Sequence, residues 1–327
     1  MRKVLLATTA LVAMTGYAAA DVSLSAYYEF GYSSISDDTT TDNDAMFSDT
    51  EYHIKFSETT DSGLSFSATF EVEGDSSSSS ANNDESSMTI STPEMGRFVL
   101  GQNDEANYSF QTWLPGARGS AGAWDNQYTV VTGNASGAGS AITSGLSANP
   151  TANNSADNNT FAYFSPNMGG VSMGVSTNTE GSEDNTAFGI SYTGDLAGNS
   201  FTVTAAQHSD GESSETEITT YGISFGVGSA TVAIANKNKE SGTTYDTTTT
   251  GAGIGVPLGD SMNVYASIST SEDDVSKDTL DVNSIGMDYT IASGLNFAVS
   301  VNNYSLEGSS ITNNDASEIT ASIQANF

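Results

Sequence analysis

The sequence predicts an all-β protein, a 16-stranded antiparallel transmembrane β-barrel with a long third loop folded inward. Three observations predict it: an N-terminal leader, period-two alternation of apolar residues, and connections that alternate between short and long. The last eleven residues show the alternation: apolar side chains from Ile319 to Phe327 share one face of a strand. A barrel in a membrane can close on such a strand, because pairing with the first strand removes both free edges.

The first 20 residues are typical of a secretory signal peptide. Two basic residues precede an apolar run that ends near Ala13, and small residues follow at 18–20. The run is too short to span a bilayer as a helix, which takes about 20 residues. We therefore expect residues 1–20 to be removed during export and the mature chain to begin at Asp21.

Composition narrows the function classes. No second long apolar run follows the leader, which excludes a helical membrane protein, and no Cys is present for disulfides or thiolate chemistry. The formal net charge is −32, and it becomes −34 without the two basic residues of the leader. Such a charge argues against nucleic acid as a partner. It fits either a solvated acidic surface for a saline environment or a field that attracts cations.

The period-two segments begin with Val22–Tyr32 and end with Ile319–Phe327, and they number about sixteen. Short turns are expected at Thr59 to Gly63, Thr92 to Gly96, Ser165 to Gly170, Gly194 to Asn199, Gly228-Ser229, Gly259 to Ser261 and Ala292 to Gly294. Longer polar loops are expected at Ser36 to Ala45, Asp75 to Glu85, Thr179 to Asn185, Asp210 to Glu215, Lys237 to Asp246, Ser271 to Asp278 and Glu307 to Asp315. Short turns on one rim and long loops on the other are typical of bacterial membrane barrels.

One connection, residues 103–158, is far longer than the others and contains both Trp residues. A segment of this length is too long for a structureless surface loop in a compact domain. The lumen of a sixteen-stranded barrel is wide enough for an aqueous channel. We expect the segment to fold into the barrel of residues 21–327 and to narrow that channel.

Three stretches resemble Gram-negative general porins, particularly the trimeric, Rhodobacter-type porins of alphaproteobacteria. They are FSETTDSGLSFSATFEVEGD, SMTISTPEMGRFVLGQNDEA and DNNTFAYFSPNMGGVSMGVS. The resemblance implies a homotrimer in the outer membrane, in contact with its lipid and lipopolysaccharide. It also implies a water-filled pore in each barrel for passive diffusion of small hydrophilic solutes and ions, without catalysis.

In that family, acids of the third loop usually face a cluster of Arg on the barrel wall. Acidic candidates in this loop are Asp104, Glu105, Asp125 and Asp157. Acidic candidates on the inner faces of strands are Glu29, Glu51, Glu71, Glu73, Asp281, Asp288 and Glu318. The basic candidates are few: Lys55, Arg97 and Arg118, with His53. This imbalance predicts a cation-preferring pore, because charged rings on a pore wall select by sign.

The two Arg candidates have an alternative role, in which each pairs with a nearby carboxylate and holds the loop in place. Lys237, Lys239 and Lys277 are expected in outer loops as solvated charges.

Other site chemistries have weak signals. No sequence pattern singles out a catalytic triad, and His53 and His208 lie far apart without a second His or Cys nearby, which argues against a zinc site. The acidic group Asp37, Asp38, Asp42 and Asp44 could bind Ca²⁺ through oxygen ligands, although it lacks the order of an EF-hand loop. The alternative for this group is a hydrated loop.

Two other functions are compatible with the sequence. One is a substrate-selective channel with aromatic residues along a sugar path, for which the candidates are Tyr27, Trp113, Trp124 and Tyr128. The other is a secreted β-sandwich that acts as an adhesin or binding module.

Overall fold

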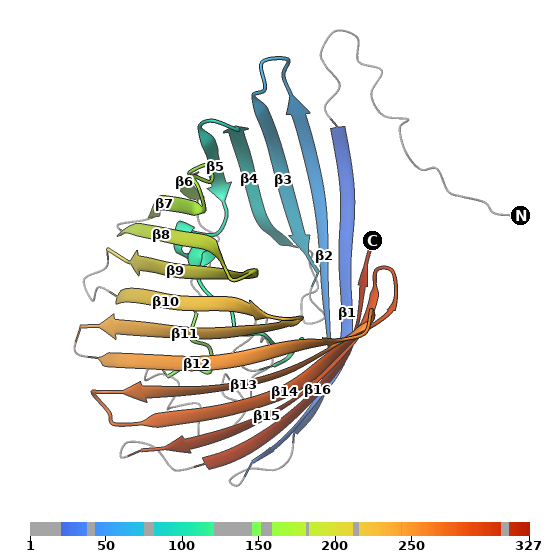
Figure 1. Cartoon of the computed structure of the whole chain (residues 1–327), viewed down its shortest axis with the longest axis vertical. Coiled ribbons are helices and arrows are strands. Elements are labelled where there is room, and N and C mark those ends of the chain that lie inside the picture. Colours follow the sequence, from blue (N-terminus) through green and yellow to red (C-terminus); the bar gives the residue numbers. More distant parts are fainter. Residues whose placement is uncertain are drawn as a thin grey trace, which may run out of the picture.

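The computed structural model describes residues 21–37, 43–74, 82–120, 146–151, 159–180, 183–211, 216–242, 244–308 and 314–327. In these residues, sixteen antiparallel strands form one closed barrel, in which β1 pairs with β16 (Figure 1). The closed barrel confirms the predicted fold class and is incompatible with a β-sandwich. Among the described residues, no helix is long and apolar enough to cross a membrane.

The strands and the one short 3-10 helix of the described residues have the following bounds. They are β1 Asp21–Asp37, β2 Asn43–Thr59, β3 Ser65–Glu73, β4 Asn82–Thr92, β5 Gly96–Gln102, η1 Ala106–Phe110, β6 Asn159–Phe164, β7 Val171–Glu180, β8 Glu183–Leu196, β9 Asn199–Ser209, β10 Thr216–Val227, β11 Ala230–Ser241, β12 Tyr245–Leu258, β13 Met262–Asp273, β14 Thr279–Ala292, β15 Leu295–Glu307 and β16 Asn314–Asn326.

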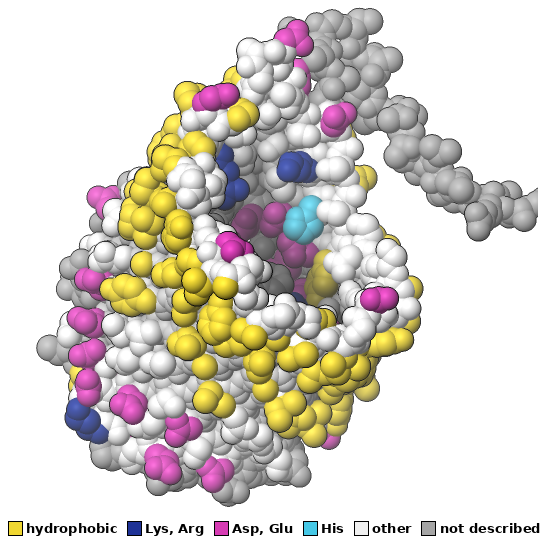
Figure 2. Space-filling view, in the orientation of Figure 1, with side chains coloured by type: hydrophobic (Ala, Val, Ile, Leu, Met, Phe, Trp, Pro, Cys, Tyr) yellow, Lys and Arg dark blue, Asp and Glu magenta, His cyan; other side chains and the backbone are white. Residues whose placement is uncertain are grey.

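The barrel is apolar outside and mostly polar inside. On β1, Tyr28 and Phe30 are exposed on the outer face, whereas Glu29 and Ser33 are buried on the inner face. The same alternation continues around the barrel and leaves hydrophobic side chains exposed on its outer surface (Figure 2). This arrangement is stable in lipid, because the bilayer solvates the outer face and each strand of the described barrel pairs its backbone with a neighbour on both sides.

The seam between the first and last strands is formed as predicted. Phe30 of β1 lies opposite Ile323 of β16, and β16 also pairs with β15 on its other side. At the end of the seam, the backbone N–H of Phe327 donates to the carbonyl of Ala26 at 2.9 Å, and Ala26 N–H donates to the Phe327 carbonyl at 3.3 Å. Neither terminal strand therefore keeps a free edge along this register.

On the long-loop side, the strands extend further than predicted. The expected loop from Lys237 to Asp246 is wrong in extent, since β11 continues to Ser241 and β12 begins at Tyr245. Outer-face polar residues bond across the extended part of β11, where Thr248 Oγ1 donates to Asn238 Oδ1 at 3.2 Å. Because apolar alternation marks only the part of a strand that faces lipid, it cannot detect the polar part that continues beyond it.

One acidic candidate faces the opposite way from its predicted direction. Asp281 was expected in the lumen, but it lies on the outer face of β14, between the inward-facing residues Leu280 and Val282. Its Oδ1 accepts a hydrogen bond from Thr270 Oγ1 of β13 at 2.6 Å. Asp281 has the same strand parity as the lipid-facing Ile285, so the alternation itself assigns it to the outside.

Substitution at Ile323 tests the assignment of the outer face to lipid. Ile323→Arg is expected to lower the free energy of unfolding from lipid vesicles by about 2–4 kcal/mol, because it places a cation in the apolar band. Ile323→Leu serves as the matched control, and urea titration of the vesicle-inserted protein gives both values. Equal stability of the two variants would contradict a lipid-facing position for this residue.

Candidate functional site

The third loop lies against the inner wall of the barrel. After β5 it forms η1, which packs on β7, β8 and β9, and it then runs across the inner faces of later strands. The neighbours along this path are Phe110 with Gly189 of β8, Thr112 with Gly222 of β10, Leu114 with Gly251 of β12, and Ala117 with Gly286 of β14. The inward fold of the loop is therefore confirmed for its described residues.

Inward-facing glycines make this close approach possible. A Cβ at Gly189 would lie 2.5 Å from Phe110 Cβ, and a Cβ at Gly286 would lie 2.7 Å from Ala117 Cβ. Carbon atoms cannot approach so closely without displacement of the loop or the strand. We call Gly189, Gly222, Gly251 and Gly286 the glycine track. The sequence contained a signal for it, because inward strand positions occupied by Gly mark a close approach of another segment.

A buried acid and a histidine hold the start of the loop. Glu105, which was predicted to be a constriction acid, is only 1% exposed and contacts His208 Nδ1 of β9 through Oε2. Its Oε1 accepts a hydrogen bond from Asn178 Nδ2 at 3.2 Å. The prediction for Glu105 is thus wrong in role, because its carboxylate lies beneath the loop and away from the lumen. His208 is completely buried and has a structural role that the sequence analysis missed.

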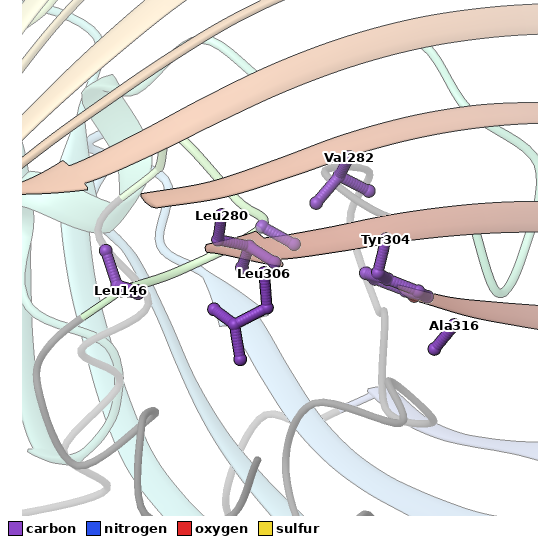
Figure 3. Close-up of a cluster of buried hydrophobic side chains, with 7 residues drawn as sticks. Leu146, Leu280, Val282, Tyr304, Leu306 and Ala316 are labelled. Atoms are coloured by element: carbon purple, nitrogen blue, oxygen red, sulfur yellow. The ribbon is translucent and has the colours of Figure 1, made fainter. Parts of the chain in front are cut away.

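The returning arm of the loop, residues 146–151, covers β13 to β16 from inside. Leu146 and Ala148 pack in an apolar cluster (Figure 3) whose other members are Leu280, Val282, Tyr304, Leu306 and Ala316. Lys237 Nζ donates to the carbonyl of Asn149 at 2.7 Å, and the residue Lys237 is only 6% exposed. The prediction of a solvated Lys237 in an outer loop is therefore wrong, since this side chain points inward from β11 and supports the arm.

Arg118 connects the third loop to β1 and β2, which lie across the β1–β16 seam from the later strands that the loop covers. Its Nη2 contacts Oε2 of Glu29 on β1 and Oδ2 of Asp49 on β2, the latter at 3.1 Å. The guanidinium is also 5.5 Å from the ring centroid of Tyr27. The side chains of Arg118, Glu29 and Asp49 are 10%, 0% and 11% exposed, so all three are largely buried. Of the two roles considered for Arg118, the geometry favours the structural one.

Glu318 has a similar internal role and does not face open lumen. It is completely buried, and its carboxylate accepts hydrogen bonds from Ser33, Asn302 and Tyr304. Asn302 Nδ2 also donates to the backbone carbonyl of Gly119 at 2.7 Å. Glu318 therefore links the seam to the loop, contrary to its expected place on an exposed acidic wall.

The inner faces of β2 and β3 carry a group of accessible charged side chains. Glu51, His53 and Lys55 follow each other at period two on β2, and Glu71 and Glu73 lie opposite them on β3. We call these five residues the acidic wall. Figure 2 shows a hollow at one end of the barrel in which acidic, basic and histidine side chains gather. The predicted inward placement of these residues agrees with the structure.

The remaining candidates are dispersed. Arg97 lies 4.2 Å from the ring centroid of Phe164, and Asp288 accepts a hydrogen bond from Tyr265 on the inner face. Asp104 is half-buried at the start of the loop. Lys239 lies over the ring of Tyr245, and Lys277 pairs with Asp274 on the outside.

Several predicted residues lie outside the described parts of the chain or are described only in backbone. Asp38, Asp42, Trp124, Asp125, Tyr128 and Asp157 lie outside the described residues, and only the backbone of Asp37 is described. Asp44 accepts a hydrogen bond from Ser34 Oγ at 2.7 Å. The calcium site stays a prediction.

A family model for Gram-negative porins matches residues 7–309. The chain belongs to this family. The porin's fold resembles that of an anion-selective porin from Comamonas acidovorans, with a TM-score of 0.67 and 15% identity over 94% of this chain and 100% of the other. A triple variant of the Rhodopseudomonas blastica porin matches with a TM-score of 0.64 and 18% identity, over the same shares of the two chains. No curated protein sequence matches.

Family membership confirms the resemblance inferred from the three sequence stretches and identifies the molecule as a porin channel. Together with the barrel fold, it points to the outer membrane of a Gram-negative cell. At 15% and 18% identity, the structural matches establish the shared fold alone. The charges that line this porin's lumen must therefore be assessed from its own side chains.

A methyl group on the glycine track tests the seat of the loop. Gly189→Ala is expected to lower the free energy of unfolding by about 1–3 kcal/mol, because the new Cβ collides with Phe110. Gly226→Ala is the matched control, since a Cβ there has no atom nearer than 3.8 Å. Urea titration gives the free energy of unfolding of both variants. Equal effects would contradict the close contact, and addition of Phe110→Gly, which removes the opposing Cβ and ring, should relieve the collision in the first variant.

Removal of the Arg118 guanidinium tests its pairing. Arg118→Met should destabilise the porin by about 3–5 kcal/mol, because it leaves two carboxylates without their shared cation in a poorly solvated place. Thermal unfolding of R118M is compared with that of K55M, which removes a cation from the accessible wall. Adding E29Q and D49N to R118M should restore much of the lost stability, and failure of both expectations would refute a structural ion pair.

Proposed function

We propose that this porin is an outer-membrane channel for passive diffusion of small hydrophilic solutes and ions, with a preference for cations and without covalent chemistry. The observation that carries the proposal is the composition of the acidic wall. Glu51, Glu71 and Glu73 bring three carboxylates to the inner face, against the single permanent cation of Lys55. A negative lumen raises the local concentration of cations and lowers that of anions.

The position of Arg118 supports the same sign. Arg118 is bound between Glu29 and Asp49, and Arg97 stacks on Phe164. Neither one lies among the residues of the acidic wall. The charge of Arg118 is largely offset where it lies, so it contributes little positive potential to the accessible lumen.

The barrel fold does not determine the sign of the selectivity. The Comamonas acidovorans porin has a similar fold and is described as anion-selective. Selectivity must then follow from the side chains that line each pore. In this chain those side chains are predominantly acidic, which is why we propose the opposite preference.

The assembly and export of the porin are part of the proposal. We propose removal of residues 1–20, assembly as a homotrimer, and contact of the outer surface with membrane lipid and lipopolysaccharide. The leader supports the first step, and the band of exposed apolar residues supports a lipid-facing or subunit-facing outer surface.

A reversal-potential measurement in planar bilayers tests the function. Under a KCl gradient, the wild type should show a potential of the sign given by K⁺ permeation. The triple variant E51Q/E71Q/E73Q should reduce the ratio of cation to anion permeability several-fold, because it removes the carboxylates that attract K⁺.

The matched control is E217Q/E272Q/D281N, which removes the same charge from exposed outer-face positions and should change the ratio much less. Anion preference in the wild type would refute the proposed selectivity. Absence of conductance would refute the channel. Saturation of the ionic conductance by added sugar would instead support the substrate-selective alternative.

A further inference from the structure

A histidine on the acidic wall lies between two carboxylates. Glu51 and His53 are two residues apart on β2 and point to the same side, and β-sheet register puts Glu71 of β3 directly opposite His53. His53 Nε2 is 3.0 Å from Glu51 Oε1, and His53 Nδ1 is 3.3 Å from Glu71 Oε1. One potential ligand atom from each residue lies within 4.8 Å of the others.

We propose that Glu51, His53 and Glu71 form a binding site for a divalent transition-metal ion of the Zn²⁺ type. One imidazole nitrogen and two carboxylate oxygens are the donor types of several three-ligand zinc sites, in which water completes the coordination. Ligand atoms about 2.0–2.1 Å from a tetrahedral Zn²⁺ are separated from each other by about 3.3 Å. Each observed contact is close to that separation, but the two contacts are made through different ring nitrogens, so one glutamate must rotate toward the nitrogen that binds the metal.

The electrostatic surroundings favour a dication at this place. Glu73 lies opposite Glu51 in the strand register, so a third carboxylate adjoins the site, while Lys55 lies one inward position further along β2, opposite Thr69. Bound Zn²⁺ would offset the mutual repulsion of these carboxylates. The side chains of Glu51 and His53 are each 32% exposed, and that of Glu71 is 22% exposed, so ions in the lumen can reach them.

The donor set also selects among dications. Mg²⁺ prefers six oxygen ligands and retains several waters, whereas an imidazole nitrogen favours Zn²⁺, Ni²⁺ or Cu²⁺. The chain has two histidines and no cysteine, and the other histidine, His208, is completely buried against Glu105. Any accessible imidazole ligand in the folded porin must therefore be His53.

The expectation that no zinc site exists rested on the distance in sequence between the two histidines. It did not consider that strand register surrounds a single histidine with glutamates from two strands. Binding of the metal does not depend on conduction. Block of ion flow by the bound metal, in contrast, rests on the proposed channel function.

Calorimetric titration of the detergent-solubilised porin with ZnCl₂ tests the site. We expect one Zn²⁺ per chain in the wild type and a loss of at least about tenfold in affinity in His53→Gln, which removes the nitrogen ligand without changing the charge of a neutral histidine. Glu73→Gln is the matched control: it removes a charge from the same wall but none of the three ligands, so its affinity for Zn²⁺ should change far less. Mg²⁺ should bind more weakly, and with equal strength to the wild type and H53Q.

Two results would overturn the site: no Zn²⁺ binding in the wild type, or equal Zn²⁺ affinity in the wild type and H53Q, which would indicate a diffuse counter-ion effect. Electron paramagnetic resonance of bound Cu²⁺ gives an independent readout, because coupling to one imidazole nitrogen should be present in the wild type and absent in H53Q.

Single-channel recording separates the proposed metal site from the proposed channel function. Zn²⁺ block of the wild type and its absence in H53Q would support both, whereas calorimetric binding without any conductance would refute the channel and leave the metal site standing.

Discussion

The structure depends on closure of the backbone hydrogen-bond ladder around the barrel. A strand in lipid has no water to bond its N–H and C=O groups, so every edge must find a partner within the protein. The decisive partner here is the last strand, which pairs with β1 on one side and with β15 on the other. Closure fixes the alternation for all sixteen strands of the described chain, because a shift by one residue would exchange lipid-facing and lumen-facing side chains.

The closed barrel also encloses an interior. The third loop covers one part of the inner wall and leaves another part accessible. The loop and its returning arm cover the inner faces of later strands through the glycine track and the apolar cluster around Leu280. Arg118 then ties the loop to Glu29 and Asp49 beside the seam. The acidic wall on β2 and β3 stays accessible, so the seating of the loop determines which charges meet a passing ion.

The sequence was sufficient for the barrel, since period-two alternation, turn residues and loop lengths are local signals. It was insufficient for the roles of Glu105, Lys237 and Glu318, because their burial depends on where a distant loop crosses the wall. The polar ends of β11 and β12 were missed for another reason: strands beyond the lipid lose their apolar face but keep their backbone pairing. The carboxylates around His53 could be recognised only once the register of β2 and β3 was known.

The seating of the loop can be tested directly by a disulfide between engineered cysteines at Leu114 and Gly253, since the chain has no cysteine of its own. A Cβ at Gly253 would lie 3.4 Å from Cβ of Leu114, close to the separation of about 3.5–4.5 Å in disulfides. Oxidation of folded L114C/G253C should give a nearly complete intramolecular cross-link, seen as a gel-mobility shift that reductant reverses. The pair L114C/G226C, whose glycine lies away from the loop, should stay reduced. Free thiols in the first pair, or equal cross-linking of both pairs, would contradict the position of the loop on which the division of the lumen depends.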